Sequence, residues 1–153
     1  MLIVIAQPEE LKLVKELGYE NEPILITGVG GVNVIKALDH LPRDTEILNI
    51  GYCGSNSNKL PIGTRVYIDQ VHTLHEKAVF REPSNYASGI YKMGCQCRDC
   101  YTSTDFVTET NIKEPCVFDM ELAFIRAIFP NTRAIKVVSD YLNMNEYNEN
   151  VGE

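Results

Sequence analysis

The chain has 153 residues, a formal net charge of −7, and 44% hydrophobic and 23% charged residues. This composition is typical of a globular protein, and the length suffices to bury roughly two-thirds of the unfolded surface. The acidic balance and the absence of a Lys/Arg-rich run argue against a nucleic-acid partner, which needs a basic footprint. No stretch approaches the roughly 20 apolar residues of a membrane span, so we expect no membrane partner either.

The first ten residues lack the basic region and the cleavage pattern of a signal peptide, and they read as a strand. We therefore expect a cytoplasmic protein. In that compartment the five cysteines are expected to be thiols rather than a disulfide framework.

The N-terminal half alternates between short apolar strands and amphipathic helices. This order implies parallel strand pairing with right-handed crossovers. The third strand is expected to break at the Gly51–Gly54 segment. The predicted elements are a strand over 2–5, a helix from 8 to 17, a strand over 24–26, a helix over 32–41 and a strand over 46–50.

The middle of the chain is less regular, and the C-terminal part returns to a strand–helix alternation. A stretch rich in Pro, Ser, Asn, Gly and Cys predicts a loop, and the polar, Asn-rich end predicts a frayed tail. The predicted elements are strands over 65–71, 78–80 and 101–107, a loop over 82–100, a helix over 119–129, a strand over 134–139 and a tail over 143–153.

Two carboxylates stand where regular elements are expected to begin or end. Asp140 follows a buried strand, at the edge where open α/β sheets form their ligand crevice. Glu121 lies in the first turn of the predicted helix, where negative charge is favoured. Together they indicate a site that binds a polar ligand and moves a proton, although acids at such positions also serve as turn formers and helix caps.

Three cysteines lie within six residues, at Cys95, Cys97 and Cys100. With Cys116, or with His72 or His75, they have the ligand types of a zinc site. The spacing is not the paired Cys-x2-Cys of zinc ribbons, and no second pair follows. We therefore expect neither a metal nor another cofactor, and a zinc-stabilised interaction protein stays as an alternative.

Several short motifs occur in an order that resembles the superfamily of purine nucleoside phosphorylases and methylthioadenosine/S-adenosylhomocysteine nucleosidases. The family typically has a Ser-Gly-Ile-Gly turn, an Asn-Thr-Gly-x-x-Gly turn, a Glu-Met-Glu segment and a Ser-Asp strand end. The matching segments are Thr27-Gly28-Val29-Gly30, Asn49-Ile50-Gly51-Tyr52-Cys53-Gly54, Phe118-Asp119-Met120-Glu121 and Ser139-Asp140.

The resemblance implies a role for each matched residue. Asp140 corresponds to the acid that protonates or hydrogen-bonds purine N7 as the glycosidic bond breaks. Glu121 corresponds to the carboxylate that binds the ribose hydroxyls, with Met120 under the sugar. Phe106 and Val107 fall near the place where an aromatic residue stacks on the base. The expected substrate-binding residues are completed by Gly54, Cys53 and Ser139.

In the nucleosidase branch a Glu after the first strand orients the attacking water. Glu9 and Glu10 are both candidates for this role, and Pro8-Glu9-Glu10 is also an ordinary helix start. The phosphorylase branch holds phosphate with a Gly-Asp-Pro-x-Arg type of segment, which two acids replace here. Because acids repel phosphate, the resemblance favours water as the acceptor.

The chain also departs from the family. It is shorter, Asp119 replaces the first Glu of the Glu-Met-Glu segment, and Tyr141 and Leu142 follow Asp140 where small residues are usual. Tyr52 stands at a normally small position, where its ring is expected to crowd the pocket. These changes support an alternative, a catalytically weak protein on the same fold that binds a nucleoside or has a regulatory role.

The sequence therefore predicts one nucleoside phosphorylase-like domain over 1–153, with a three-layer α/β fold and a mixed, mostly parallel central sheet flanked by helices. The predicted function is hydrolysis of the N-glycosidic bond of a purine nucleoside or thioadenosine. Family members assemble as dimers or larger oligomers, so we expect the chain to bind copies of itself.

Overall fold

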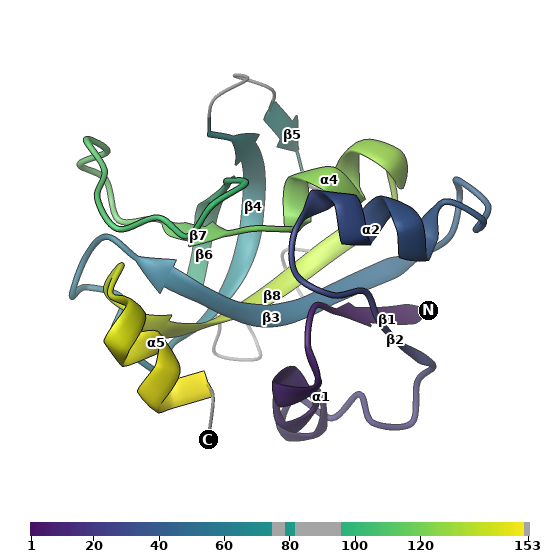
Figure 1. Ribbon diagram of the computed structural model, residues 1–153, viewed down its shortest axis with the longest axis horizontal. Helices are drawn as coiled ribbons and strands as arrows, with labels where there is room; N and C mark the ends of the chain where they lie inside the picture. Colours follow the sequence, from purple (N-terminus) through teal and green to yellow (C-terminus); the bar gives the residue numbers. More distant parts are fainter. Residues whose placement is uncertain (75–78, 82–95, 152–153) are drawn as a thin grey trace.

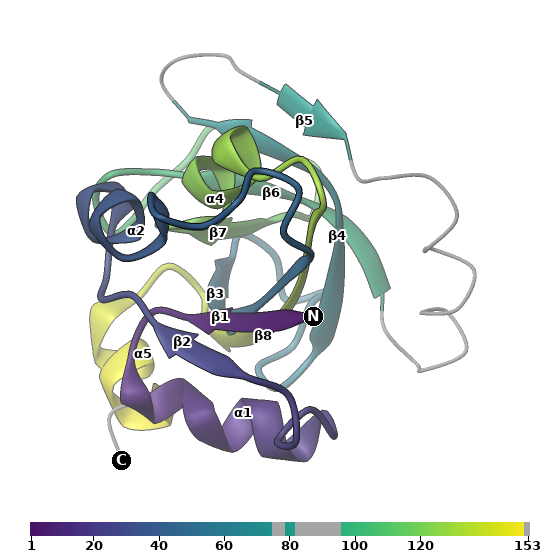
Figure 2. The same ribbon diagram turned by 90° about the vertical axis from the view of Figure 1, so that its right-hand side faces the viewer.

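The computed structural model describes residues 1–74, 79–81 and 96–151. Within these ranges the chain forms one mixed sheet of eight strands with helices on both faces (Figures 1 and 2). Helices α2 and α4 lie on one face, and α1 and α5 lie on the other. The predicted class, an α/β fold with a mixed, mostly parallel sheet flanked by helices, is confirmed.

The N-terminal strands pair in parallel around β1, as their alternation with helices predicts. Strand β1 lies between β2 and β3 and is parallel to both. Pro8 opens the first helical segment, a position where its missing N–H costs nothing. The elements are β1 Leu2–Ile5, η1 Pro8–Glu10, α1 Leu11–Glu16, β2 Ile24–Ile26, α2 Gly31–Leu38 and β3 Ile47–Ser55.

The remaining strands bend the sheet until it closes on itself. Strand β3 pairs in parallel with β8 and, near its end, antiparallel with β7. Strands β7, β6, β4 and β8 then pair in sequence, which completes the ring. The elements are β4 Arg65–Thr73, β5 Val79–Arg81, β6 Gln96–Thr102, β7 Val117–Asp119, α4 Leu122–Ile128, β8 Thr132–Asp140 and α5 Met144–Val151.

The expected break at Gly51 is wrong, because β3 continues through both glycines to Ser55. The partner strand β8 is as long as β3 and supplies ladder bonds along this whole stretch. A register shift between Cys53 and Gly54 is the only sign of irregularity in this pairing. The glycines are therefore strand residues, and their lack of a side chain leaves space for the carboxylates of Glu10 and Asp140.

The middle of the chain is more regular than predicted. Residues 96–100, assigned to a loop, belong to β6, whereas 82–95 lie outside the described residues. The strand predicted over 101–107 ends at Thr102. Similarly, the helix predicted from Asp119 begins at Leu122, and Asp119 ends the short strand β7. Pairing with distant strands decides these boundaries, and a local pattern does not contain that information.

The tail predicted to fray over 143–153 contains helix α5, so that prediction is wrong for 144–151. The side chain of Val151 is 1% exposed, and the Asn150 amide donates to the carbonyl of Ser139 on β8 (2.9 Å). A buried apolar side chain and a hydrogen bond to β8 thus help to hold this polar helix in place.

The apolar core consists of three clusters, one on each side of the parallel strands and one inside the closed ring. None of the helices among the described residues is long and apolar enough to cross a bilayer. The three clusters are centred on Ile3, Leu13, Leu48 and Ile135, on Val4, Leu38, Ile125 and Phe129, and on Leu60, Val66, Val117 and Val138.

Candidate active site

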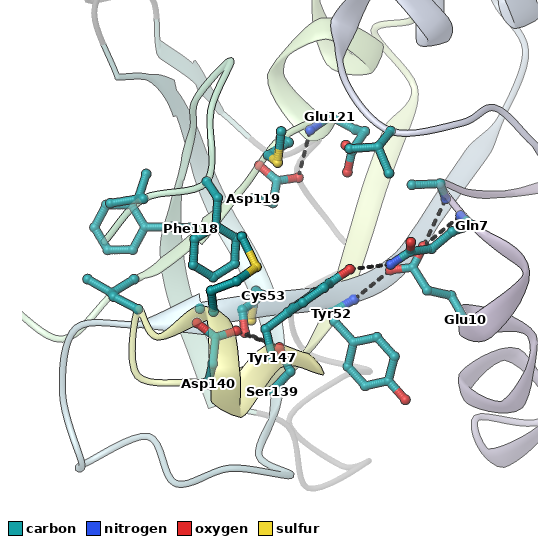
Figure 3. Close-up of a pocket in the computed structure, with 18 residues that line it drawn as sticks. Gln7, Glu10, Tyr52, Cys53, Phe118, Asp119, Glu121, Ser139, Asp140 and Tyr147 are labelled. Carbon is teal, nitrogen blue, oxygen red and sulfur yellow. Dashed lines mark hydrogen bonds between the residues drawn. The ribbon is translucent and has the colours of Figure 1, made fainter. Parts of the chain in front are cut away.

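A cavity of about 270 Å³ opens at the carboxyl ends of β1, β3 and β8, where ligand sites of α/β sheets form (Figure 3). Four carboxylates contribute to its wall, together with mostly apolar and aromatic side chains. The lining residues are Ala6, Gln7, Glu10, Val29, Tyr52, Cys53, Gly54, Phe106, Val107, Phe118, Asp119, Met120, Glu121, Ser139, Asp140, Leu142, Met144 and Tyr147. Nine of the ten predicted site residues are therefore in one place.

Asp140 lies at one end of the cavity and is 1% exposed. The Ser139 hydroxyl donates to its Oδ1 (2.7 Å), and the backbone N–H of Asn143 donates to its Oδ2 (3.3 Å). Burial raises the pKa of Asp140, and these two hydrogen bonds oppose the rise. A carboxyl of this kind keeps its proton to a higher pH than an exposed aspartate does.

The register shift in β3 brings Gly54, rather than its neighbour, opposite Asp140. A β-carbon at Gly54 would lie 3.0 Å from Asp140 Oδ2 and 2.9 Å from Leu142 Cδ2. The missing side chain thus makes room for the acid. The carbonyl oxygen of Cys53 lies 3.3 Å from the Ser139 hydroxyl oxygen, as a longer alternative acceptor for the proton that Ser139 donates to Asp140.

Glu10 lies at the other end of the cavity and is 4% exposed. Its Oε1 accepts from the backbone N–H groups of Ala6 (2.9 Å) and Gln7 (3.2 Å), and its Oε2 accepts from that of Tyr52 (2.8 Å). Burial raises the pKa of Glu10, whereas Lys136 and the three N–H groups lower it. Glu9, the other candidate, is exposed and lies outside the cavity wall.

Glu121 precedes the first residue of α4 and points toward the loop before α2. Its Oε2 accepts from the backbone N–H of Gly30 (2.8 Å), whose φ of 92° suits a residue without a side chain. Burial and the neighbouring Asp119 raise the pKa of Glu121 to about 7. The group therefore changes its charge within the physiological range.

Asp119 and Lys136 form a buried ion pair behind these acids, with Nζ 3.1 Å from Asp119 Oδ2. Burial by itself would raise the pKa of Asp119, but Lys136 and the bonds from Thr102 and Leu122 hold it below the usual value. The surrounding carboxylates raise the pKa of Lys136 against the effect of its burial. Lys136 was not among the predicted site residues, although a lysine within the apolar run of β8 is a visible signal.

Helix α5 closes part of the cavity mouth through Tyr147, which the sequence also did not predict. The Gln7 amide donates to the Tyr147 hydroxyl, so the ring reaches across from α5 to the loop after β1 (Figure 3). Phe106 packs edge-on against this ring, with centroids 5.6 Å apart. The aromatic pair forms an apolar surface beside Met120 and Val107.

The expectation that Tyr52 crowds the cavity is wrong, because its ring points away from it (Figure 3). The ring packs with the cluster around Leu13 of α1, and the ammonium of Lys12 lies 5.6 Å from its centroid. Alternation along β3 explains this placement, since neighbouring residues of a strand face opposite sides.

The cysteines that the structure describes do not form a metal cluster. Across residues 1–74, 79–81 and 96–151, no group of three or more His, Cys, Asp or Glu side chains is arranged to hold a metal ion. Cys100 is buried and donates to Asp119 Oδ1 (3.3 Å), and burial raises its pKa well above the usual value. Cys95 and His75 lie outside the described residues.

No protein-family model and no curated protein matches the sequence. Solved structures do match. The 5′-methylthioadenosine/S-adenosylhomocysteine nucleosidase of Helicobacter pylori has a TM-score of 0.77 at 13% identity, and the match covers 98% of this chain and 90% of that one. Futalosine hydrolase of the same organism has a TM-score of 0.76 at 12% identity, with 98% and 89% covered.

A variant of the nucleosidase of Chlamydia trachomatis, solved with MTA bound, has a TM-score of 0.74 at 18% identity, with 97% and 87% covered. The TM-scores establish a shared fold, and at identities this low they establish the fold alone. The resemblance read from short motifs is thus confirmed at the level of structure: the chain has the fold of the methylthioadenosine/S-adenosylhomocysteine nucleosidases and futalosine hydrolase of the nucleoside phosphorylase superfamily.

Proposed function

We propose that this protein is a nucleosidase that hydrolyses the N-glycosidic bond of a purine nucleoside or thioadenosine. The observation that carries the proposal is the convergence of Asp140, Glu121 and Glu10 on one cavity. Three carboxyl groups with different surroundings can take three different parts in one reaction. The nucleosidase fold of the chain and the binding of MTA by a protein of that fold support a nucleoside as the ligand.

Asp140 is the proposed general acid. Breaking the bond between C1′ and N9 leaves the electron pair on the base, and a proton delivered to N7 neutralises it. The raised pKa of Asp140 shifts the group toward its protonated form, and the bond from Ser139 fixes the orientation of the carboxyl group. Phe106 and Val107 are the proposed contacts of the base, because both line the cavity.

Glu121 is the proposed ligand of the ribose hydroxyls, with Met120 against the sugar. In its ionised form it accepts two hydroxyl bonds and stabilises the positive charge that develops on the sugar as the base departs. The Gly30 N–H holds one oxygen of the carboxylate, which leaves the other free for the ligand.

Glu10 is the proposed group that orients the water. The water oxygen forms the new bond to C1′, and its proton passes to Glu10, so the products are the free base and the free sugar. Three backbone N–H groups fix the Glu10 carboxylate before the ligand arrives. The four carboxylates that line the cavity also disfavour a phosphate nucleophile, which carries negative charge itself, and the nearby Lys136 is already paired with Asp119.

The test is incubation of the protein with methylthioadenosine, adenosine and inosine, each with and without inorganic phosphate. Free base together with a free sugar, at the same rate in both conditions, is the expected result. A sugar 1-phosphate, or release only with phosphate, would refute water as the acceptor. Binding of these compounds without release of a base would instead support the alternative of a nucleoside-binding protein.

Self-association belongs to the same proposal. Apolar side chains on β2, on α2 and on the loop between them are exposed, which is the kind of surface that a second subunit covers. These residues are Ile26, Val29, Val32 and Ile35, of which Val32 is 73% exposed. The mass in solution, measured by light scattering for the wild-type protein and Val32→Glu, tests whether the chain forms a dimer through this surface.

A further inference from the structure

A chain of buried polar contacts runs through the sheet from β1 to α4. The amide of Asn49 donates to the carbonyl of Val4 (2.9 Å) and accepts from Lys136 Nζ (2.6 Å). Nζ in turn lies 3.1 Å from Asp119 Oδ2. Asn49 and Lys136 are 2% and 1% exposed, so these contacts form in a medium where an unpaired group is costly.

The Asp119 carboxylate also binds the start of α4. Its Oδ2 accepts from the backbone N–H of Leu122 (2.8 Å) and, more weakly, from that of Glu121 (3.4 Å). Its Oδ1 accepts from the Thr102 hydroxyl (2.5 Å), whose oxygen accepts from the N–H of Ala123 (3.0 Å). The first amides of a helix have no partner within it, and here Asp119 and Thr102 supply one.

Glu121 is therefore held at both ends, its backbone by Asp119 and its side chain by the Gly30 N–H. We propose that the Asp119–Lys136 pair positions Glu121. The pair fixes where the Glu121 carboxylate lies in the cavity wall and which charges surround it. The role as a ribose contact rests on the proposed function, but the positioning itself concerns the unliganded protein.

The charges that face Glu121 come from three elements. Asp119 on β7 and Glu10 on η1 repel its ionised form, and Lys136 on β8 attracts it. Burial and the repulsion by Asp119 exceed the attraction by Lys136, and the result is a pKa of about 7 for Glu121. Removal of the charge on Asp119 is therefore expected to lower the pKa of Glu121. Removal of both charges of the pair is expected to lower it by less, because the loss of Lys136 offsets part of the change.

Three variants separate positioning from simple stability. Lys136→Arg keeps the charge, Asp119→Asn removes the repulsion, and Asp119→Asn with Lys136→Met removes both charges without leaving one unpaired. The first measurement is the titration of the Glu121 carboxyl carbon by NMR in the unliganded protein, assigned by its loss in Glu121→Gln. The expected order of midpoints is wild type and Lys136→Arg highest, the double variant lower and Asp119→Asn lowest.

The second measurement is the KM of methylthioadenosine at pH 8.5, or its Kd if there is no turnover, where Glu121 is ionised in every variant. We expect at least a tenfold rise in this KM or Kd in the double variant, and wild-type values in Lys136→Arg. Absence of any turnover or binding in the wild-type protein would refute the proposed function and leave the NMR order as the test of positioning.

An unchanged Glu121 midpoint in Asp119→Asn, or in a folded double variant, would overturn the proposal. The same holds for a changed midpoint in Lys136→Arg. If Asp119→Asn and the double variant both fail to fold, the pair is an element of stability rather than of positioning, and the proposal is also overturned.

Discussion

Gly51 lies directly against the carboxylate of Glu10: a β-carbon at this position would be 2.6 Å from Glu10 Oε2 and 3.3 Å from Lys136 Nζ. Real β-carbons essentially never lie within 3.0 Å of a neighbouring heavy atom, so an alanine here must displace one of these groups. The glycine within β3 is therefore the condition for bringing a buried carboxylate and a buried ammonium to the same side of the sheet.

Gly51→Ala is expected to lower the rate of base release by at least about tenfold, because it moves Glu10 away from the N–H of Tyr52 and from the attacking water. Gly18→Ala is the matched control. It has no atom within 4 Å of the added carbon, but its φ of 86° strains the backbone, so it lowers stability far from the cavity. Equal rates in the two variants would show that Gly51 has no special relation to Glu10.

Glu9 and Glu10 form a second matched pair, adjacent in sequence but opposite in exposure. Glu10→Gln removes the group that accepts the water proton, so the rate is expected to fall by about 10²–10⁴-fold. Glu9→Gln should retain at least half of the wild-type rate, since this side chain is outside the cavity. The comparison of initial rates with methylthioadenosine decides between them, and a loss in Glu9→Gln alone would reverse the assignment.

The raised pKa of Glu121 predicts that the free energy of unfolding depends on pH. Its pKa is about 7 when folded and near 4.5 when unfolded, so the folded state binds the proton more tightly between these values. Relative to Glu121→Gln, the wild-type protein should therefore gain stability as pH falls through 7, and lose it as pH rises. Denaturant unfolding at pH 5, 6, 7 and 8 should show a difference that changes by about 1–3 kcal/mol, since partial relaxation reduces the full shift.

The acids that do not interact with Glu121 are common to the two proteins, so their contributions cancel in this comparison. A difference in unfolding free energy that stays constant from pH 5 to pH 8 would contradict the raised pKa. The affinity for methylthioadenosine should follow the opposite trend, since the ionised form binds the hydroxyls, and should weaken below pH 7.

Half of the residues that line the cavity could be predicted from the sequence, because they sit in short motifs with local signals: an acid after a strand, an acid at a helix start, and a segment with two glycines. The roles of Lys136 and Tyr147 could not be predicted in this way. The partners of Lys136 are on other strands, and the hydrogen-bond partner of Tyr147 is 140 positions away in the sequence. Their roles depend on the closure of the sheet, which strand patterns alone do not reveal.

The position of Tyr147 depends on how α5 attaches to the sheet. Val151→Ala removes two methyl groups from a buried site and is expected to cost about 1–2 kcal/mol of unfolding free energy and to raise the KM of methylthioadenosine. Glu149→Ala changes the exposed side of the same helix and should leave both quantities within error. Thermal unfolding and initial rates test this, and an unaffected Val151→Ala would show that α5 does not support the site.

Asp140→Asn tests the proposed acid most directly. An amide has nearly the same shape and can still accept from the Ser139 hydroxyl, but it has no proton to give to N7. The kcat for methylthioadenosine should fall by about 10²–10⁴-fold, with a change in KM of less than about threefold. Asp69→Asn, on the exposed side of β4, should keep the wild-type rate. A kcat that survives in Asp140→Asn would mean that the base leaves without protonation by this residue, and the role of acid would then have to pass to another group of the cavity.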